Sequence, residues 1–136
     1  MIKGYTQGTY DMFHIGHLNL LRNAKAHCDY LIVGVNADEL VESYKNKKPI
    51  IPIEERIAIV SAIRYVDEVV VTNTLDKVAM WNELHFDEIY IGDDWLGNAR
   101  WAQTGRDMEA LGAKLVYLPY TKDTSSTLLR DKLVDY

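Results

Sequence analysis

Residues 2–35 decide the fold and read IKGYTQGTYDMFHIGHLNLLRNAKAHCDYLIVGV. The short β-prone stretch Ile2–Gln7 is followed by Gly16–Ala26, in which apolar side chains recur at mainly helical spacing, and then by the apolar run Tyr30–Val35. A run that is apolar throughout suits a strand covered on both faces, as in a parallel sheet. These residues therefore predict a strand, a helix and a second, buried strand.

The same alternation continues along the rest of the 136 residues. Further strands are expected over Glu68–Val71, Glu88–Ile91 and Lys114–Leu118. Further helices are expected from Pro52, which suits a first helical turn, and over Leu75–Leu84, Asn98–Leu111 and Ser125–Val134. Asn36–Lys48 is expected to be a polar loop. Five strands alternating with helices predict an α/β fold, a doubly wound parallel sheet in a single domain over residues 1–136.

Composition excludes several classes of partner. Fifteen Lys and Arg against twenty Asp and Glu give a net charge of −5, whereas sequence-independent nucleic-acid binding needs a basic surface. No run approaches the roughly 20 apolar residues of a membrane span, and the first residues lack the apolar core of a signal peptide. The single cysteine, Cys28, fits a reducing cytosol. We expect a cytoplasmic protein with no nucleic-acid or membrane partner, in which an anionic substrate meets a local basic pocket.

Polar clusters follow four strand ends, at residues 8–17, 36–48, 92–95 and 119–127, where sheets of this kind bind their ligands. The first is residues 8–17, GTYDMFHIGH, between a strand end and a helix start, where free backbone N–H groups favour an anion. His14 and His17 are spaced to face one pocket across the first helical turn, so their imidazoles can donate hydrogen bonds to phosphate. The alternatives are a metal pair with Asp11 as third ligand, or two histidines that only cap the helix.

A family resemblance rests on this cluster and on two later segments. The motif His14-x-Gly16-His17, after Gly8-Thr9-Tyr10-Asp11, resembles the nucleotidyltransferase superfamily that carries HxGH. The segments GDDWLG (92–97) and RYVDEV (64–69) resemble its cytidylyltransferase branch, and the whole chain looks most like the small glycerol-3-phosphate cytidylyltransferases. The resemblance implies a Rossmann-like fold with strand order 3-2-1-4-5, usually in a homodimer. It also implies an enzyme that transfers CMP from CTP to a phosphorylated alcohol and releases pyrophosphate.

The resemblance also implies roles for single residues. It assigns catalysis to His14, His17, Lys47 and Arg56. It assigns the nucleotide site to Gly8, Thr9, Tyr10, Asp11, His14, Gly16, His17, Lys47, Asp94, Tyr120, Thr121, Ser125, Ser126 and Thr127. It assigns the acceptor site to Lys45, Lys77 and Trp95, with Mg²⁺ arriving with CTP and no metal ligand assigned to the protein.

Several of these assignments have a structural alternative. Lys45, Lys47 and Lys48 can be a solvated charge run, and Arg56 a surface arginine paired with Glu55 or Asp67. Asp94 can cap a helix, and the hydroxyls of residues 125–127 can do the same. Tyr120 stands where the family usually has an arginine, and our hypothesis is that Lys122 supplies the missing charge.

The expected acceptor is sn-glycerol 3-phosphate, and the product would be CDP-glycerol for cell-wall, capsule or lipid precursors. Three alternatives stay open: another acceptor such as phosphoethanolamine, phosphocholine or another amino-alcohol phosphate; an adenylyltransferase; or a nucleotide-binding module that catalyses nothing. Comparing pyrophosphate release from CTP and ATP, with a panel of phospho-alcohols, separates them.

Overall fold

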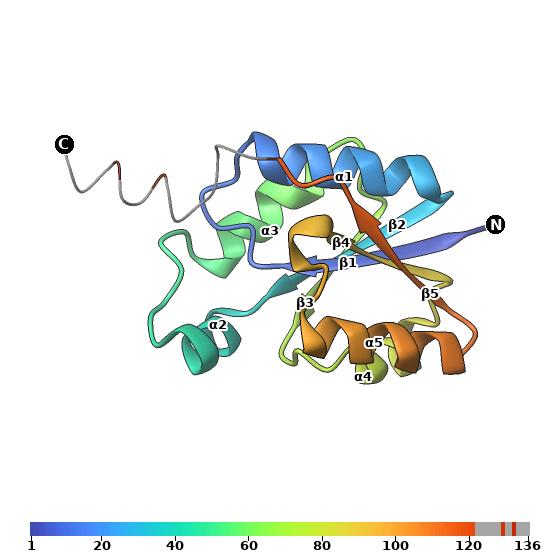
Figure 1. The fold of residues 1–136 in the computed structure, drawn as a ribbon. Helices are drawn as coiled ribbons and strands as arrows, with labels where there is room; N and C mark the ends of the chain where they lie inside the picture. Colours follow the sequence, from blue (N-terminus) through green and yellow to red (C-terminus); the bar gives the residue numbers. More distant parts are fainter. Residues whose placement is uncertain (122–128, 130–131, 133–136) are drawn as a thin grey trace.

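The computed structural model describes residues 1–121, 129 and 132, and its centre is a parallel sheet of five strands (Figure 1). The strands lie in the order β3-β2-β1-β4-β5, as the resemblance implied. Their bounds are β1 Lys3–Gly8, β2 Tyr30–Asn36, β3 Glu68–Thr72, β4 Glu88–Gly92 and β5 Lys114–Leu118. The strand order reverses between β1 and β4, so the carboxyl ends of these two strands mark the place where α/β sheets bind ligands.

Helices cover both faces of the sheet. Those on one face are α1 Ile15–His27 and α3 Ile53–Ser61, and those on the other are α4 Lys77–Leu84 and α5 Ala99–Ala110 (Figure 1). Two shorter elements follow strand ends, α2 Asp38–Lys45 after β2 and the 3₁₀ turn η1 Asp93–Trp95 after β4. Among the described residues, none of these helices has the length and apolar character needed to cross a membrane.

Two hydrophobic cores explain why the strands are apolar on both sides. In β2, Leu31, Val33 and Val35 pack into the core beneath α1 and α3, whereas Ile32 packs into the core beneath α4 and α5. None of these four side chains is more than 2 % exposed. The prediction of a strand buried on both faces is therefore confirmed.

One helix was not expected from the sequence. α2 lies in the stretch predicted as a polar loop, and it is short, with Val41 as its buried residue. Two signals were available: its acidic first turn, Asp38 and Glu39, and the helical spacing of Leu40, Val41 and Tyr44. The other described helices begin and end within two residues of the prediction, with Pro52 as the N-cap of α3 rather than part of its first turn. The predicted last helix, Ser125–Val134, falls on residues of which all but two lie outside the described part of the chain.

The carboxyl edge of the sheet gathers the segments that carry the predicted site. Parallel pairing places Gly8 beside Val35 and Gly92 beside Leu118, so the segments after β1, β2, β4 and β5 leave the same edge. Polar clusters that are more than 100 residues apart in sequence, His14 and Tyr120 among them, therefore lie together. Two cavities open at this edge.

Candidate active site

Two histidines cap the N-terminus of α1. His14 is the N-cap residue, and its Nδ1 accepts a hydrogen bond from the Gly16 N–H at 3.0 Å, while His17 Nδ1 accepts one from the His14 N–H at 3.2 Å. The two rings stack with their centroids 3.9 Å apart. Since each Nδ1 is an acceptor, each neutral ring carries its proton on Nε2. Capping, which the sequence offered as an alternative to phosphate binding, thus leaves each ring with one Nε2–H donor for a ligand.

Burial keeps both imidazoles neutral near pH 7. It lowers the pKa of His14. The pKa of His17 is lowered to about 3, mainly by burial and in smaller part by the neighbouring His14, while Asp11 opposes the shift. Neutral imidazoles act as hydrogen-bond donors and not as positive charges. The positive charge that a polyphosphate requires must therefore come from other side chains.

Two cavities meet at His17 and Leu20. One has a volume of about 260 Å³ and is called here the lysine cavity; the other, of about 270 Å³, is called the aromatic cavity. The lysine cavity is lined by Gln7, Gly8, Thr9, Tyr10, Asp11, His17, Leu20, Val41, Lys45, Lys47, Lys48 and Pro49. The aromatic cavity is lined by His14, Gly16, His17, Leu20, Ile91, Gly92, Asp94, Trp95, Pro119, Tyr120 and Thr121. A ligand with phosphates at its centre can occupy both cavities, with the histidine pair between them.

The lysine cavity brings Lys45, Lys47 and Lys48 together with residues 8–11. Lys45 is the last residue of α2, and the other two lie in the segment that follows it. The Lys45 ammonium lies 5.8 Å from the centroid of the Tyr44 ring. Three ammonium groups at one cavity give a local positive potential in a chain of net charge −5, which suits a phosphorylated ligand.

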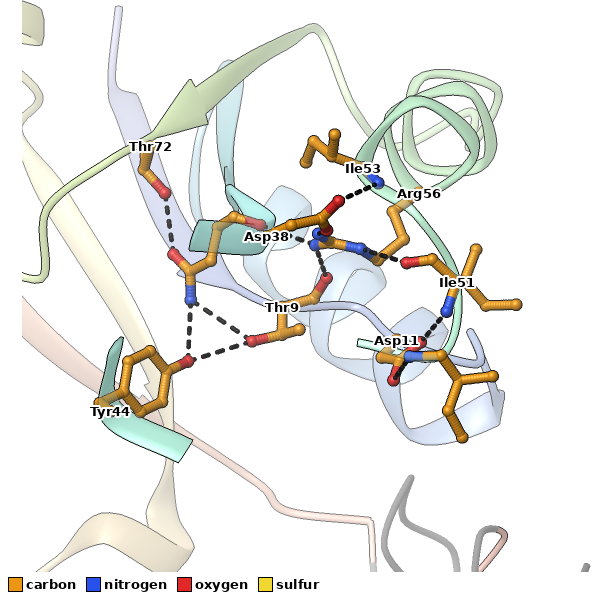
Figure 2. Close-up of polar contacts among 10 residues, drawn as sticks. Thr9, Asp11, Asp38, Tyr44, Ile51, Ile53, Arg56 and Thr72 are labelled. Atoms are coloured by element: carbon orange, nitrogen blue, oxygen red, sulfur yellow. Dashed lines mark hydrogen bonds and ion pairs between the residues drawn. The ribbon is translucent and has the colours of Figure 1, made fainter. Parts of the chain in front are cut away.

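Arg56 has a different place from the one expected. It is 1 % exposed, and its guanidinium donates hydrogen bonds to three backbone carbonyls and pairs with one carboxylate, the partners being Thr9, Asn36, Ile51 and Asp38 (Figure 2). The expectation that Arg56 touches phosphate is corrected accordingly, because its donors are already engaged inside the protein. The surface alternative, a pair with Glu55 or Asp67, is also wrong, since the carboxylate partner is Asp38.

Asp11 faces the segment that carries the lysines. It is 5 % exposed, and its two carboxylate oxygens accept hydrogen bonds from the Ile50 and Ile51 N–H groups, each at 2.9 Å (Figure 2). Both oxygens are thus engaged by backbone, as are the Nδ1 atoms of the two histidines. Among the described residues, no group of three or more His, Cys, Asp or Glu side chains is arranged to hold a metal ion, so the alternative of a metal pair completed by Asp11 is not supported.

The aromatic cavity has two partly exposed aromatic walls. Trp95 is 40 % exposed and Tyr120 is 38 % exposed, and Asp94 lies between β4 and Trp95. Burial raises the pKa of Asp94 above its ordinary value, and the neighbouring Asp93 raises it further. Asp94 does not cap the next helix, because the N-cap of α5 is Asn98. The cavity therefore offers flat faces and a carboxyl group, which suits a nucleobase and ribose.

The segment after β5 is tied to the rest of the site by two hydrogen bonds. The Tyr120 N–H donates to Asp93 Oδ1 at 3.1 Å, and Asn19 Nδ2 donates to Thr121 Oγ1 at 3.0 Å. Tyr120 and Thr121 thus line the aromatic cavity, where the predicted nucleotide contact can be made. The predicted contacts Ser125, Ser126 and Thr127, and the hypothesis about Lys122, lie outside the described residues.

Lys77 is not brought to either cavity. It lines a separate cavity of about 210 Å³ together with Arg100 and Asp107, and its ammonium donates to the Leu75 carbonyl at 2.8 Å and lies 5.3 Å from the Trp101 ring centroid. Burial, followed by the charge of Arg100, lowers the pKa of Lys77 to about 8. The expectation that Lys77 holds the acceptor is therefore corrected by its position.

Three polar residues that support the lysine cavity from outside its lining were missed from the sequence. The buried Asn36 and Thr72 share a hydrogen bond of 2.8 Å, and the Tyr44 hydroxyl lies 3.4 Å from Asn36 Nδ2 and 3.2 Å from Thr9 Oγ1 (Figure 2). Asn36 ends β2, and a polar residue at the end of an apolar strand is a usable signal. Tyr44 carries no signal beyond its position next to Lys45.

Comparison with known proteins gives a consistent answer. A family described as cytidylyltransferase-like matches residues 5–132. The chain is 36% identical over 134 residues to the glycerol-3-phosphate cytidylyltransferase of Bacillus subtilis (strain 168), covering 98% of each chain. It is 41% identical over 92 residues to the ethanolamine-phosphate cytidylyltransferase of Dictyostelium discoideum, which is 66% of this chain and 26% of that protein. A solved structure of a lipopolysaccharide core biosynthesis protein from Thermoplasma volcanium GSS1 superposes with a TM-score of 0.74 at 25% identity, covering 91% of this chain and 99% of that one.

Proposed function

The chain belongs to the cytidylyltransferase-like family, and on that premise we propose that it transfers CMP from CTP to a phosphorylated alcohol, with sn-glycerol 3-phosphate as the acceptor. The observation that carries the proposal is the meeting of a lysine-lined cavity and an aromatic cavity at two imidazole donors. The relative with that acceptor in its name matches over the whole chain, whereas the ethanolamine-phosphate relative matches over two thirds of it.

The proposed reaction needs charge stabilisation more than a base. An oxygen of the acceptor phosphate, already an anion near pH 7, attacks the α-phosphorus of CTP and forms the new P–O bond. The bond from that phosphorus to the bridging oxygen breaks, and its electron pair leaves with pyrophosphate. His14 and His17 donate through Nε2–H to oxygens on which charge grows, and the lysines bind the phosphates.

Mg²⁺ is proposed to arrive with CTP. In nucleotide enzymes this ion is usually held by substrate phosphates, water and one or two carboxylates. Asp94 is a carboxyl group that lines the aromatic cavity, so the donor set fits such a partial role. When bound, the ion would offset negative charge on the triphosphate.

The charge of the lysine cavity favours glycerol phosphate over amino-alcohol phosphates. A cationic head group needs carboxylates or aromatic faces around it, yet this cavity has three lysines, and Asp11, the one carboxylate in its lining, accepts two backbone N–H groups. A neutral polyol avoids the repulsion. Phosphoethanolamine and phosphocholine are therefore expected to be poor acceptors.

The test is pyrophosphate release by the full chain with CTP or ATP and a panel of phospho-alcohols. The expected result is turnover with CTP and glycerol 3-phosphate, with kcat/KM for the amino-alcohol phosphates lower by about tenfold or more, which corresponds to about 1.4 kcal/mol. Turnover with ATP in place of CTP, or nucleotide binding without pyrophosphate release, would overturn the proposal in favour of an adenylyltransferase or a binding module.

Assembly and location complete the proposal. A homodimer working in the cytoplasm is proposed from the family resemblance and the single cysteine, with CDP-glycerol passed on to cell-wall, capsule or lipid synthesis. Light scattering on the purified chain tests the dimer, because a monomeric mass at working concentration would contradict it.

A further inference from the structure

The turn that follows β1 includes Thr9 and Asp11, and it contacts both ends of the segment that carries the lysines. This segment, Tyr44–Ile51, is called here the lysine strap, and it includes Lys45, Lys47 and Lys48. At its first residue, the Tyr44 hydroxyl lies 3.2 Å from Thr9 Oγ1. At its end, the N–H groups of Ile50 and Ile51 donate to the Asp11 carboxylate, each at 2.9 Å (Figure 2). Thr9 and Asp11 are two residues apart in sequence. The strap is therefore held at both ends by the same turn, and Lys47 and Lys48 lie between the two contacts.

The anchoring turn is itself held in an unusual conformation. Tyr10 and Met12, on either side of Asp11, have φ angles of 55° and 49°, in the left-handed region that non-glycine residues rarely adopt. Such backbone persists where its surroundings fix it. Here Arg56 donates to the Thr9 carbonyl of the turn at 2.7 Å and to the Ile51 carbonyl of the strap at 2.9 Å, so one buried guanidinium joins the two (Figure 2).

We propose that Tyr44 and Asp11 are positioning residues, which place the strap lysines around the phosphorylated substrate through the strap backbone. The nature of that substrate rests on the function proposed above. Ordering the backbone of a loose loop costs free energy, so an ammonium group on such a loop gives up part of its attraction for phosphate to that ordering. Fixing the backbone on both sides of Lys47 removes most of that cost before the substrate binds.

The first experiment measures the anchors without any substrate. Asp11→Asn keeps one carbonyl oxygen and replaces the other acceptor by an NH₂ group, and its matched control is Asp87→Asn, where the carboxylate accepts the Lys3 N–H at 2.9 Å at the opposite edge of the sheet. Hydrogen exchange of the Ile50 and Ile51 amides is expected to become about tenfold faster in Asp11→Asn. It is expected to stay as in the wild type in Asp87→Asn.

The second experiment reads the effect on substrate. Tyr44→Phe removes one hydroxyl, and its control is Tyr30→Phe, which removes the hydroxyl that donates to Glu68 at the first residue of β2. Tyr44→Phe and Asp11→Asn are expected to raise KM for CTP or the acceptor by roughly tenfold with kcat within about twofold, since lost ground-state placement acts on KM. Adding Lys47→Ala to either variant is expected to give less than the product of the separate effects.

Three results would overturn the proposal: unchanged Ile50 and Ile51 exchange in Asp11→Asn, a fall in kcat at constant KM, or effects that multiply fully with Lys47→Ala. A wild-type chain that turns over none of the nucleotides would defeat the proposed function alone. Hydrogen exchange, together with calorimetric measurement of pyrophosphate binding, would still test whether Asp11 positions the strap. That binding is expected to weaken about tenfold in Asp11→Asn and to stay unchanged in Asp87→Asn.

Discussion

His14 caps α1 through Nδ1 and keeps Nε2–H for a ligand, so one ring caps the helix and can also take the chemical role proposed above. Asparagine is among the best N-cap residues but has no imidazole. His14→Asn is therefore expected to keep the melting temperature within about 2 °C while kcat falls roughly 100-fold. His14→Ala should also lower stability, by about 1 kcal/mol. Thermal denaturation and steady-state kinetics measure both effects. A kcat near that of the wild type in His14→Asn would show that the imidazole only caps the helix and has no part in catalysis.

Gly16 is required by the neighbouring imidazole. A Cβ at this position would lie 2.8 Å from His14 Cε1 and 3.0 Å from its Nδ1. Gly16→Ala should push the ring from its place and lower kcat by about 10-fold or more, as expected for a displaced hydrogen-bond donor. Its control is Gly105→Ala in α5, where the nearest neighbour of the added Cβ is a leucine methyl carbon at 3.3 Å. If the two variants had equal effects on kcat, the position of the His14 ring would not be the reason that a glycine is needed at residue 16.

At the scale of elements, local signals predicted local structure. The apolar run of β2 and the strand–turn–helix of residues 8–17 depend on neighbours in sequence, and both were predicted. The helix α2 was missed because it has only eight residues and buries one side chain, so the helical spacing of Leu40, Val41 and Tyr44 is brief within a largely polar stretch. The burial of Arg56 was missed for another reason. Its partners come from the ends of β1 and β2 and from two later segments, and only the folded chain brings these together.

The role of Arg56 as a link between elements can be measured. Arg56→Lys keeps the charge but replaces a planar group with five donors by a single ammonium, which cannot reach all four acceptors. The free energy of unfolding from urea titration is expected to fall by about 2–3 kcal/mol, because buried carbonyls lose their partners. Arg106→Lys on the exposed face of α5 is the control and should change it by less than about 0.5 kcal/mol. If Arg56→Lys instead raised KM without changing the free energy of unfolding, Arg56 would be inferred to contact a substrate phosphate, as the sequence first suggested.

At the scale of the whole molecule, the half-buried His17 couples stability to pH. The unfolded chain protonates His17 near pH 6.5, whereas burial in the fold lowers its pKa to about 3. Between these two values the unfolded state binds more protons, so the free energy of unfolding falls as the pH falls. Between pH 7 and pH 5, His17 should remove about 1–2 kcal/mol. Glutamine at the third helical position preserves the capping arrangement without titrating. His17→Gln should therefore lose less stability than the wild type over that interval. Urea titrations of both proteins at pH 7 and pH 5 test this prediction. If the difference in their free energies of unfolding were the same at both pH values, His17 would have the same pKa in the folded and the unfolded chain.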